Sequence, residues 1–216
     1  MLKINRMVVG QLYVNCYILW DSGSKEGIIV DPGDEGGMLL NEIDKNNIIL
    51  KRVIITHGHF DHLKDAAYVS SKAKVPVLAN KEDLPLIEAA PSQAALFGFP
   101  QIKVPRIDSY IKEGDIVQVG SYGFMVLDTP GHSPGSITLY NKQERIAVVG
   151  DLLFLESIGR TDFFGGDYKT LLLSIKDRIL TMADDTLVLS GHGNETTVGH
   201  EKAYNPFLTE FYRNET

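Results

Sequence analysis

Seven side chains that suit a metal ion follow directly after short apolar runs of this chain. Five of its six histidines and two of its aspartates stand in four such places. They are His57, His59, Asp61, His62, His132, Asp151 and His192. Imidazole and carboxylate groups without a cysteine suit a borderline divalent cation, with zinc as the first choice and iron or manganese as alternatives. The residue types and their crowding therefore predict a metal site.

The number of candidate ligands exceeds what one tetrahedral ion needs and suits two ions that share one carboxylate. His57 and His59, two residues apart, can point the same way from an extended segment. Asp61 and His62 begin the next helix and face a neighbouring position. The two remaining histidines come from separate strands and can each complete one ion. Asp151 is the best bridging candidate, because a carboxylate offers two oxygens and an imidazole only one free lone pair.

The elements that must position these side chains are buried strands that each end just before a ligand. The expected strands are Val53–Ile55, Phe124–Asp128, Ile146–Val149 and Thr186–Leu189. A short turn containing glycine follows each of them, and glycine permits a sharp departure from a strand and a close backbone approach. One histidine after a strand is usually structural. Four such sites in one chain favour a shared site on loops that a rigid sheet holds in place.

The rest of the pattern predicts short strands in the first third of the chain and helices elsewhere. Helices are expected over 35–46, with Asp34 as the N-cap, over 63–72, 81–90 and 167–182, and over 201–212 with a break near Pro206. Residues 91–104 read as a loop with exposed phenylalanines, either a lid or a simple connection. In each half of the chain, several strands are followed by a helix and then by a further strand. This order predicts two sheets with helices packed outside rather than one alternating parallel sheet.

Composition narrows the class of protein. A net charge of −7 and a pI near 5.3 argue against a nucleic-acid partner. No apolar run approaches the roughly 18 residues that span a membrane, and the N-terminus lacks a cleavable leader pattern. The single cysteine, Cys16, excludes an intrachain disulfide and is expected to be buried. We therefore expect a cytoplasmic protein with a small-molecule substrate and no membrane partner, and leave the oligomeric state open.

The pattern T-H-x-H-x-D-H, followed by a distant His, Asp and His, resembles the metallo-β-lactamase superfamily over nearly the whole chain. The early turn V-D-P-G-D resembles the first motif of that superfamily, in which the aspartate, here Asp31, lies behind the metal ligands. The resemblance implies an α/β (α+β) fold, a four-layer αββα sandwich, in a single domain over residues 1–216, with two divalent ions at one edge between the sheets. It implies one ion held by His57, His59, His132 and Asp151, and another held by Asp61, His62, His192 and Asp151.

Two further stretches resemble the glyoxalase II group, especially its short single-domain bacterial branch. They are the segment SIGRTDFFGGD at 157–167 and the segment GHGNETT at 191–197 with N-P-F at 205–207. The resemblance implies hydrolysis of a thioester such as S-2-hydroxyacylglutathione by a metal-bridging hydroxide, with Asp61 and Asp151 as catalytic groups. Arg160 is expected to pair with a substrate carboxylate, or else to form a structural salt bridge. Tyr168 is expected to reach the substrate, or else to lie on a helix surface.

The chain stops soon after the last motif, whereas the longer glyoxalase II form adds a helical domain with several glutathione contacts. The thiol part of the substrate therefore stays open. His200 has no partner at ligand spacing and is expected on the surface.

Three alternatives remain beside the thioesterase reading. A persulfide dioxygenase shares the fold and would hold one iron through His57, His132 and Asp151. A lactonase or another metallo-hydrolase is less favoured. A purely structural metal site would be closed and often rich in cysteine, which these residues do not match.

Other branches of the superfamily fit less well. Class B1 β-lactamases have Cys where Asp151 stands, and flavodiiron proteins have Glu where His59 stands. The RNA-processing branches carry added arms or domains.

Overall fold

The computed structural model describes residues 1–208, and two mixed β-sheets stack face to face within them. The first sheet has the order β1 (Leu2–Val9), β2 (Val14–Asp21), β3 (Glu26–Val30), β4 (Ile49–Ile54), β5 (Val77–Ala79) and β6 (Ser109–Tyr110). The second has the order β14 (Thr196–Thr197), β13 (Leu187–Ser190), β10 (Ile146–Gly150), β9 (Ile137–Asn141), β8 (Tyr122–Asp128) and β7 (Ile116–Val119). A small hairpin pairs β11 (Leu153–Phe154) with β12 (Ser157–Ile158).

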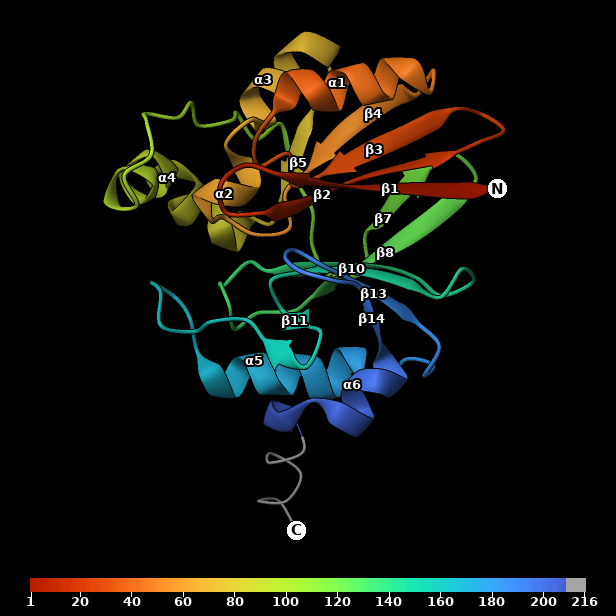
Figure 1. The fold of residues 1–216 in the computed structure, drawn as a ribbon, viewed down its shortest axis with the longest axis vertical. Coiled ribbons are helices and arrows are strands. Elements are labelled where there is room, and N and C mark those ends of the chain that lie inside the picture. The colour runs from red at the N-terminus through yellow and green to blue at the C-terminus, as the bar shows by residue number, and fades with distance from the viewer. Residues whose placement is uncertain (209–216) are drawn as a thin grey trace.

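Helices cover the outer face of each sheet, so the molecule has four layers (Figure 1). On the first sheet lie α1 (Gly36–Lys45), α2 (Phe60–Leu63), α3 (Ala66–Ala73), the turn η1 (Lys81–Asp83) and α4 (Leu84–Leu96). On the second lie α5 (Tyr168–Ser174), its π-helical continuation η2 (Ile175–Ile179) and α6 (Val198–Tyr204). One buried cluster fills the space between the sheets, and one lies under each helical layer. The expected αββα sandwich is confirmed.

Strand β2 shows how the sequence builds these layers, because it is buried along nearly its whole length. Cys16 and Ile18 pack in the cluster under the helices of the first sheet. Tyr17 and Leu19 pack in the cluster between the sheets. Successive side chains of a strand point to opposite faces, so a strand covered on both faces must be apolar throughout. The apolar run around Cys16 is therefore a central strand, and the thiol is buried as expected.

Strand direction explains why the candidate ligands meet. In the first sheet β3 and β4 run parallel. In the second, β10 runs parallel to β13, and β8 and β10 both pair antiparallel with β9, so β8, β10 and β13 point the same way. The carboxyl ends of strands that run the same way meet at one edge of a sheet. Each candidate ligand outside α2 follows such an end.

The helix through Pro91 corrects the expectation of a loop over residues 91–104. Helix α4 continues through Pro91 to Leu96, and Phe99 packs against the cluster under the first helical layer; residues 97–104 form the expected connection, and Phe97 is exposed as expected. A proline inside a helix costs about 3 kcal/mol in isolation. Here Ala90 and Ala94 on either side are fully buried, so tertiary packing overrides the local preference.

Several expected helix boundaries were also wrong. Asp34 does not cap α1; the N-cap is Glu35, in the left-handed region, and the Gly36 N–H donates to Asp65 at 2.7 Å. The helix expected over 63–72 is divided into α2 and α3. The helix expected over 167–182 begins as expected but changes to a π-helix and ends at Ile179. Of the helix expected over 201–212, residues 209–212 lie outside the described residues, and α6 begins earlier.

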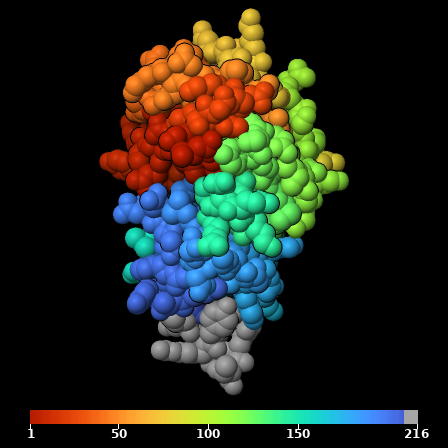
Figure 2. Space-filling model, turned by 90° about the vertical axis from the view of Figure 1, so that its right-hand side faces the viewer, coloured from red at the N-terminus to blue at the C-terminus, as the bar shows by residue number. Residues whose placement is uncertain are grey.

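The surface view shows the two halves of the chain occupying separate halves of the molecule (Figure 2). Residues coloured red to yellow cover the upper part of this face, and those coloured cyan to blue cover the lower part. The candidate ligands come from both parts of the chain, from the turn after β4 and from α2 in the first, and from the turns after β8, β10 and β13 in the second. Within residues 1–208, no helix is long and apolar enough to cross a membrane.

Candidate metal centre

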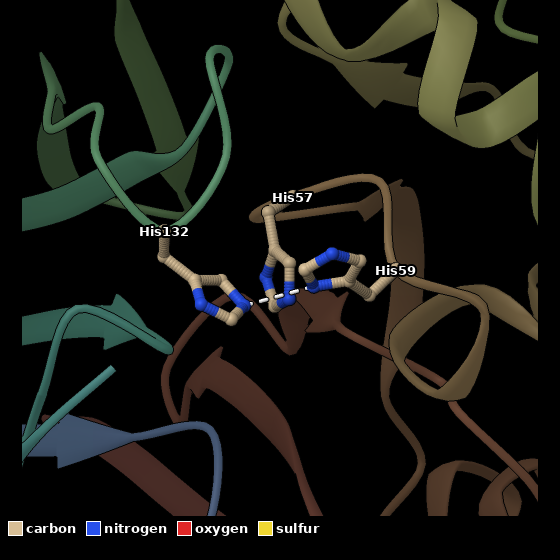
Figure 3. A group of neighbouring side chains, drawn as sticks. All are labelled: His57, His59 and His132. Carbon is tan, nitrogen blue, oxygen red and sulfur yellow. Dashed lines mark hydrogen bonds between the residues drawn. The ribbon is translucent and has the colours of Figure 1, made fainter. Parts of the chain in front are cut away.

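The first group of candidate ligands consists of three buried histidines from two turns. His57 and His59 follow β4, and His132 follows β8. Their ligand nitrogens all lie within 4.8 Å of one another. His59 Nδ1 and His132 Nε2 are 2.8 Å apart, and Figure 3 shows the three rings converging from opposite ribbons. This arrangement can surround one ion.

The second group lies beside the first and consists of Asp61, His62 and His192. Asp61 and His62 stand in α2, and His192 follows β13. Their ligand atoms also lie within 4.8 Å of one another. His62 Nε2 is 3.2 Å from His192 Nε2, which in turn is 3.5 Å from Asp61 Oδ2. The two sequence neighbours Asp61 and His62 thus lie together with His192 in a second cluster.

Asp151 lies between the two groups. Its Oδ1 is 3.4 Å from His62 Nε2, and its Oδ2 is 3.5 Å from His192 Nε2 and 3.7 Å from His132 Nε2. Gly191 makes this approach possible, because a Cβ there would lie 2.1 Å from Asp151 Oδ1. The structure therefore brings all seven candidate ligands together, with the Asp151 carboxylate between the two groups.

Unpartnered buried atoms test whether these residues fit a metal. His57 Nε2, His59 Nε2 and Asp151 Oδ1 are buried and have no hydrogen-bond partner among residues 1–208. Buried polar groups are normally satisfied, so such atoms call for an explanation. The donor set is three imidazoles on one side, two imidazoles and a carboxylate on the other, and a shared carboxylate between them. These residues fit two divalent ions, and the two His/Asp groups point to a binuclear metal site.

Burial and charge give the two groups different electrostatics. Burial lowers the pKa of His57 well below its ordinary value and that of His59 to about 4. Burial would also lower the pKa of His62, but Asp151 and Asp61 raise it well above its ordinary value. Burial would raise the pKa of Asp151, but His62 holds it well below its usual range. His57 and His59 thus present neutral imidazoles, and His62 and Asp151 pair opposite charges that a cation would replace.

A layer of hydrogen bonds behind the candidate ligands fixes their orientation. The carboxylate of Asp31 accepts the Thr56 N–H at 2.8 Å and the Thr56 hydroxyl at 2.6 Å, and it contacts His62 Nδ1 at 3.0 Å. The Thr56 hydroxyl also lies 3.0 Å from His57 Nδ1. Histidine ligands characteristically use their second nitrogen in this way, which sets the tautomer and the ring orientation. Asp31 therefore lies where the first-motif resemblance implied, behind the ligands.

His132 is held similarly, by a residue that was expected to act through its side chain. Its Nδ1 donates to the main-chain carbonyl of Arg160 at 2.7 Å. The Arg160 guanidinium itself makes two hydrogen bonds to Asp162, at 2.9 and 2.7 Å, and lies 4.3 Å from the ring centre of Phe163. Its side chain is 63% exposed. Arg160 therefore stands at the rim, already paired with a carboxylate of its own loop.

The remaining expected residues lie farther out. Tyr168 is the first residue of α5 and is half exposed, and no contact recorded within residues 1–208 joins it to the candidate ligands. His200 pairs with Glu156 at the surface at 3.0 Å, as expected of a residue outside the site. Three residues beside the candidate ligands were not expected from the sequence. The Thr56 hydroxyl contacts His57, the Phe163 ring centre lies 5.3 Å from that of His59, and the Asp83 carboxylate accepts the N–H of Gly58. Thr56 could have been found from its place in the T-H-x-H motif.

Comparison with known proteins agrees with this geometry. A family model described as the metallo-beta-lactamase superfamily matches residues 9–192. Hydroxyacylglutathione hydrolase GloC of Haemophilus influenzae is 40% identical over 196 residues, covering 90% of this chain and 92% of that protein. The crystal structure of the B3 metallo-beta-lactamase BLEG-1 is 35% identical with a TM-score of 0.89, covering 97% of this chain and 100% of that one. The structure of TTHA1623 in a di-iron-bound form is 36% identical with a TM-score of 0.87, covering 94% and 100%. This chain belongs to the metallo-β-lactamase superfamily.

Proposed function

We propose that this metallo-hydrolase cleaves thioesters such as S-2-hydroxyacylglutathione at a centre of two divalent ions. The observation that carries the proposal is the pair of compact ligand groups joined by Asp151. A cysteine-free set with a shared carboxylate favours an open catalytic site over a closed structural one. The 40% identity to GloC supports the thioester class.

Each ion has a proposed set of ligands. One set is His57, His59, His132 and Asp151, and the other is Asp61, His62, His192 and Asp151. When bound, the ions lower the pKa of a coordinated water from about 15.7 to about 7 and stabilise negative charge that develops on the substrate carbonyl oxygen. Zinc is the first choice. Iron is the leading alternative because TTHA1623 is described in a di-iron-bound form, and manganese also suits the donor set.

The chain's own residues then position the reactants. Asp61 has a side chain that is 17% exposed, so its carboxylate can hydrogen-bond the attacking water and orient it. Asp31 and the Arg160 carbonyl keep His62 and His132 turned with Nε2 toward the centre. A thiol has a pKa of about 8.5, so it leaves as a thiolate without a strong acid beside it. A site without a strong acid beside the leaving group therefore fits a thioester better than an amide.

The rim supplies the proposed substrate contacts. Arg160 offers a guanidinium to a substrate carboxylate, and glutathione has two of them. Tyr168 is the second proposed contact. We further propose that residues 1–216 form a single domain and that the protein works in the cytoplasm, where its buried thiol would stay reduced.

A substrate panel with metal content measured on the same sample tests the proposal. The panel holds a glutathione thioester, its oxygen-ester analogue, a lactone, a β-lactam and glutathione persulfide. We expect the thioester to give the highest kcat/KM and the sample to contain two ions per chain. His57→Ala should abolish the hydrolysis, whereas His200→Ala, a matched loss of a histidine at the surface, should leave it unchanged.

Other outcomes of the panel would replace the proposal. One iron per chain with oxygen uptake on glutathione persulfide would identify a dioxygenase that uses His57, His132 and Asp151. Preferred cleavage of the lactone or the β-lactam would keep the metallo-hydrolase and change its substrate class. Full activity in His57→Ala would exclude the proposed site altogether.

A further inference from the structure

Asp83 lies between the two turns that carry the first ligand group. It ends the turn η1 and is 1% exposed. Its Oδ2 accepts the Gly58 N–H at 2.7 Å and the Ser133 hydroxyl at 2.6 Å. Its Oδ1 accepts the Gly135 N–H at 2.6 Å. One buried carboxylate thus joins the turn after β4 in the first sheet to the turn after β8 in the second.

Glycine at both contact points allows this close approach. Gly58 stands between His57 and His59, and a Cβ there would lie 3.0 Å from the Asp83 carbonyl oxygen and 2.6 Å from the Leu86 Cβ. A Cβ on Gly135 would lie 2.6 Å from the Asp83 nitrogen. Packed side chains do not approach so closely, so each turn can reach Asp83 only because its contact residue is glycine.

Asp83 stands at the N-cap of α4, but its side chain does not cap that helix. Aspartate at this position commonly accepts an N–H of its own helix. Asp83 makes no such side-chain hydrogen bond to α4. Its three hydrogen bonds go instead to the turns that flank the candidate ligands.

We propose that Asp83 is a positioning residue that holds His59 and His132 at the spacing one ion requires. This inference rests on the two-ion centre proposed above. The two histidines come from different sheets, yet Nδ1 of one lies 2.8 Å from Nε2 of the other. Each is within three residues of an Asp83 contact. The second group has its own supports, Asp31 behind His62 and the pairing of His192 with Val14 of β2. Loss of Asp83 therefore weakens one ion more than the other.

Asp83→Asn tests this, because an asparagine side chain has one acceptor oxygen and one donor group and cannot accept all three hydrogen bonds. Asp21→Asn is a closely matched control. Asp21 is 6% exposed and likewise accepts two backbone N–H groups, from Gly23 and Ser121, and one serine hydroxyl, that of Ser121. It stands at the other end of β2 from Val14, about 23 Å of strand away.

The measurement is a titration of each metal-free protein with Zn²⁺ against a coloured chelator, together with thermal unfolding of the metal-free forms. We expect wild type and Asp21→Asn to bind two ions alike. In Asp83→Asn the affinity for one ion should fall by about 10–100-fold, the usual effect of losing a group behind a ligand. The other ion should stay within about threefold. Ser133→Ala, which removes one of the three hydrogen bonds, should weaken the same ion less, and it replaces Asp83→Asn if that variant does not fold.

Three results would overturn the inference. Unchanged affinities in Asp83→Asn, or in Ser133→Ala when it stands in for it, would show that the carboxylate does not position ligands. Equal weakening in Asp83→Asn and Asp21→Asn would show only a general loss of stability. Wild-type protein that binds fewer than two zinc ions would contradict the two-ion centre itself, and this outcome is distinct because it does not depend on any variant.

Discussion

The buried metal centre and its rim are in direct contact, yet they are held in different ways. His132 is 3% exposed, and its two ring nitrogens meet the Arg160 carbonyl and His59, both distant in sequence. The Arg160 side chain is largely exposed, and its two hydrogen bonds go to Asp162, two residues away. The centre is thus set by the meeting of two sheets, and the rim by one loop. The proposed metal chemistry therefore depends on the fold, whereas the proposed substrate contact at Arg160 depends on an exposed side chain that can change at little cost.

Removal of the metal ions should separate the two regions most sharply. Chelation should lower hydrolysis by about 10³-fold or more, because water then keeps its ordinary pKa. The fold should remain, since its three buried clusters do not include the ligands. Loss of each bound ion should lower the free energy of unfolding by about 3–4 kcal/mol at metal concentrations of 100–1,000 times Kd. Activity assays and circular dichroism before and after re-addition of zinc check both points, and unfolding on chelation would favour a structural metal instead.

Asp151→Ala should have the next largest effect, because it removes the one group shared by both proposed ions. We expect metal content and hydrolysis to fall together, with kcat reduced by about 10³-fold, which corresponds to roughly 4 kcal/mol. Asp162→Ala is the matched loss of an aspartate from the rim and should retain both ions. Metal analysis and steady-state kinetics on the two variants give the comparison. Hydrolysis retained in Asp151→Ala would contradict the bridging role.

Asp31→Asn should have an intermediate effect, because Asp31 contacts a ligand without being one of the proposed ligands. Asparagine cannot accept both Thr56 hydrogen bonds and the contact with His62 Nδ1. We expect zinc affinity to fall by about 10–100-fold while the ion count at saturating zinc stays at two. Asp65→Asn, whose carboxylate accepts an N–H of α1 at 2.7 Å, serves as control. Equal zinc affinity in both variants would mean that Asp31 only stabilises its turn.

The sequence predicted which side chains the fold brings together, because the candidate ligands follow a rule that sequence can express. Each turn comes directly after an apolar strand, and strands that run the same way deliver their ends to one edge. The sequence also separated His57 and His59 from Asp61 and His62, because the first two were expected in an extended segment and the other two in the helix that follows it. The four-layer fold came from the family resemblance rather than from periodicity alone.

The support that Asp83 gives could not be predicted, because it acts between elements distant in sequence, whereas Asp31 was expected behind the candidate ligands. Asp83 lies 50 residues from Ser133, with which its carboxylate shares a hydrogen bond, and nothing in its neighbourhood distinguishes it from a helix cap. The helix through Pro91 was missed for the same reason, since only its buried packing outweighs the local penalty. Asp162, the partner of Arg160, lies within the segment at 157–167. Whether its carboxylate pairs with the arginine or faces solvent depends on how this loop folds, which the sequence does not show.

Arg160→Ala and Asp162→Ala should have the smallest effects, and they sharpen the comparison because they test the rim alone. The hydrogen bonds between them raise the pKa of Arg160 and lower that of Asp162, so the pair stays ionised at neutral pH and loses its charge on Asp162 only in acid below the usual range of a carboxyl. If Arg160 binds a substrate carboxylate, its loss should raise KM by about two- to fivefold at unchanged kcat, the scale of an exposed ion pair. Asp162→Ala frees the guanidinium and should lower KM instead. Equal increases of KM in both variants would mean that the pair shapes the loop as a unit and that the arginine does not bind the substrate.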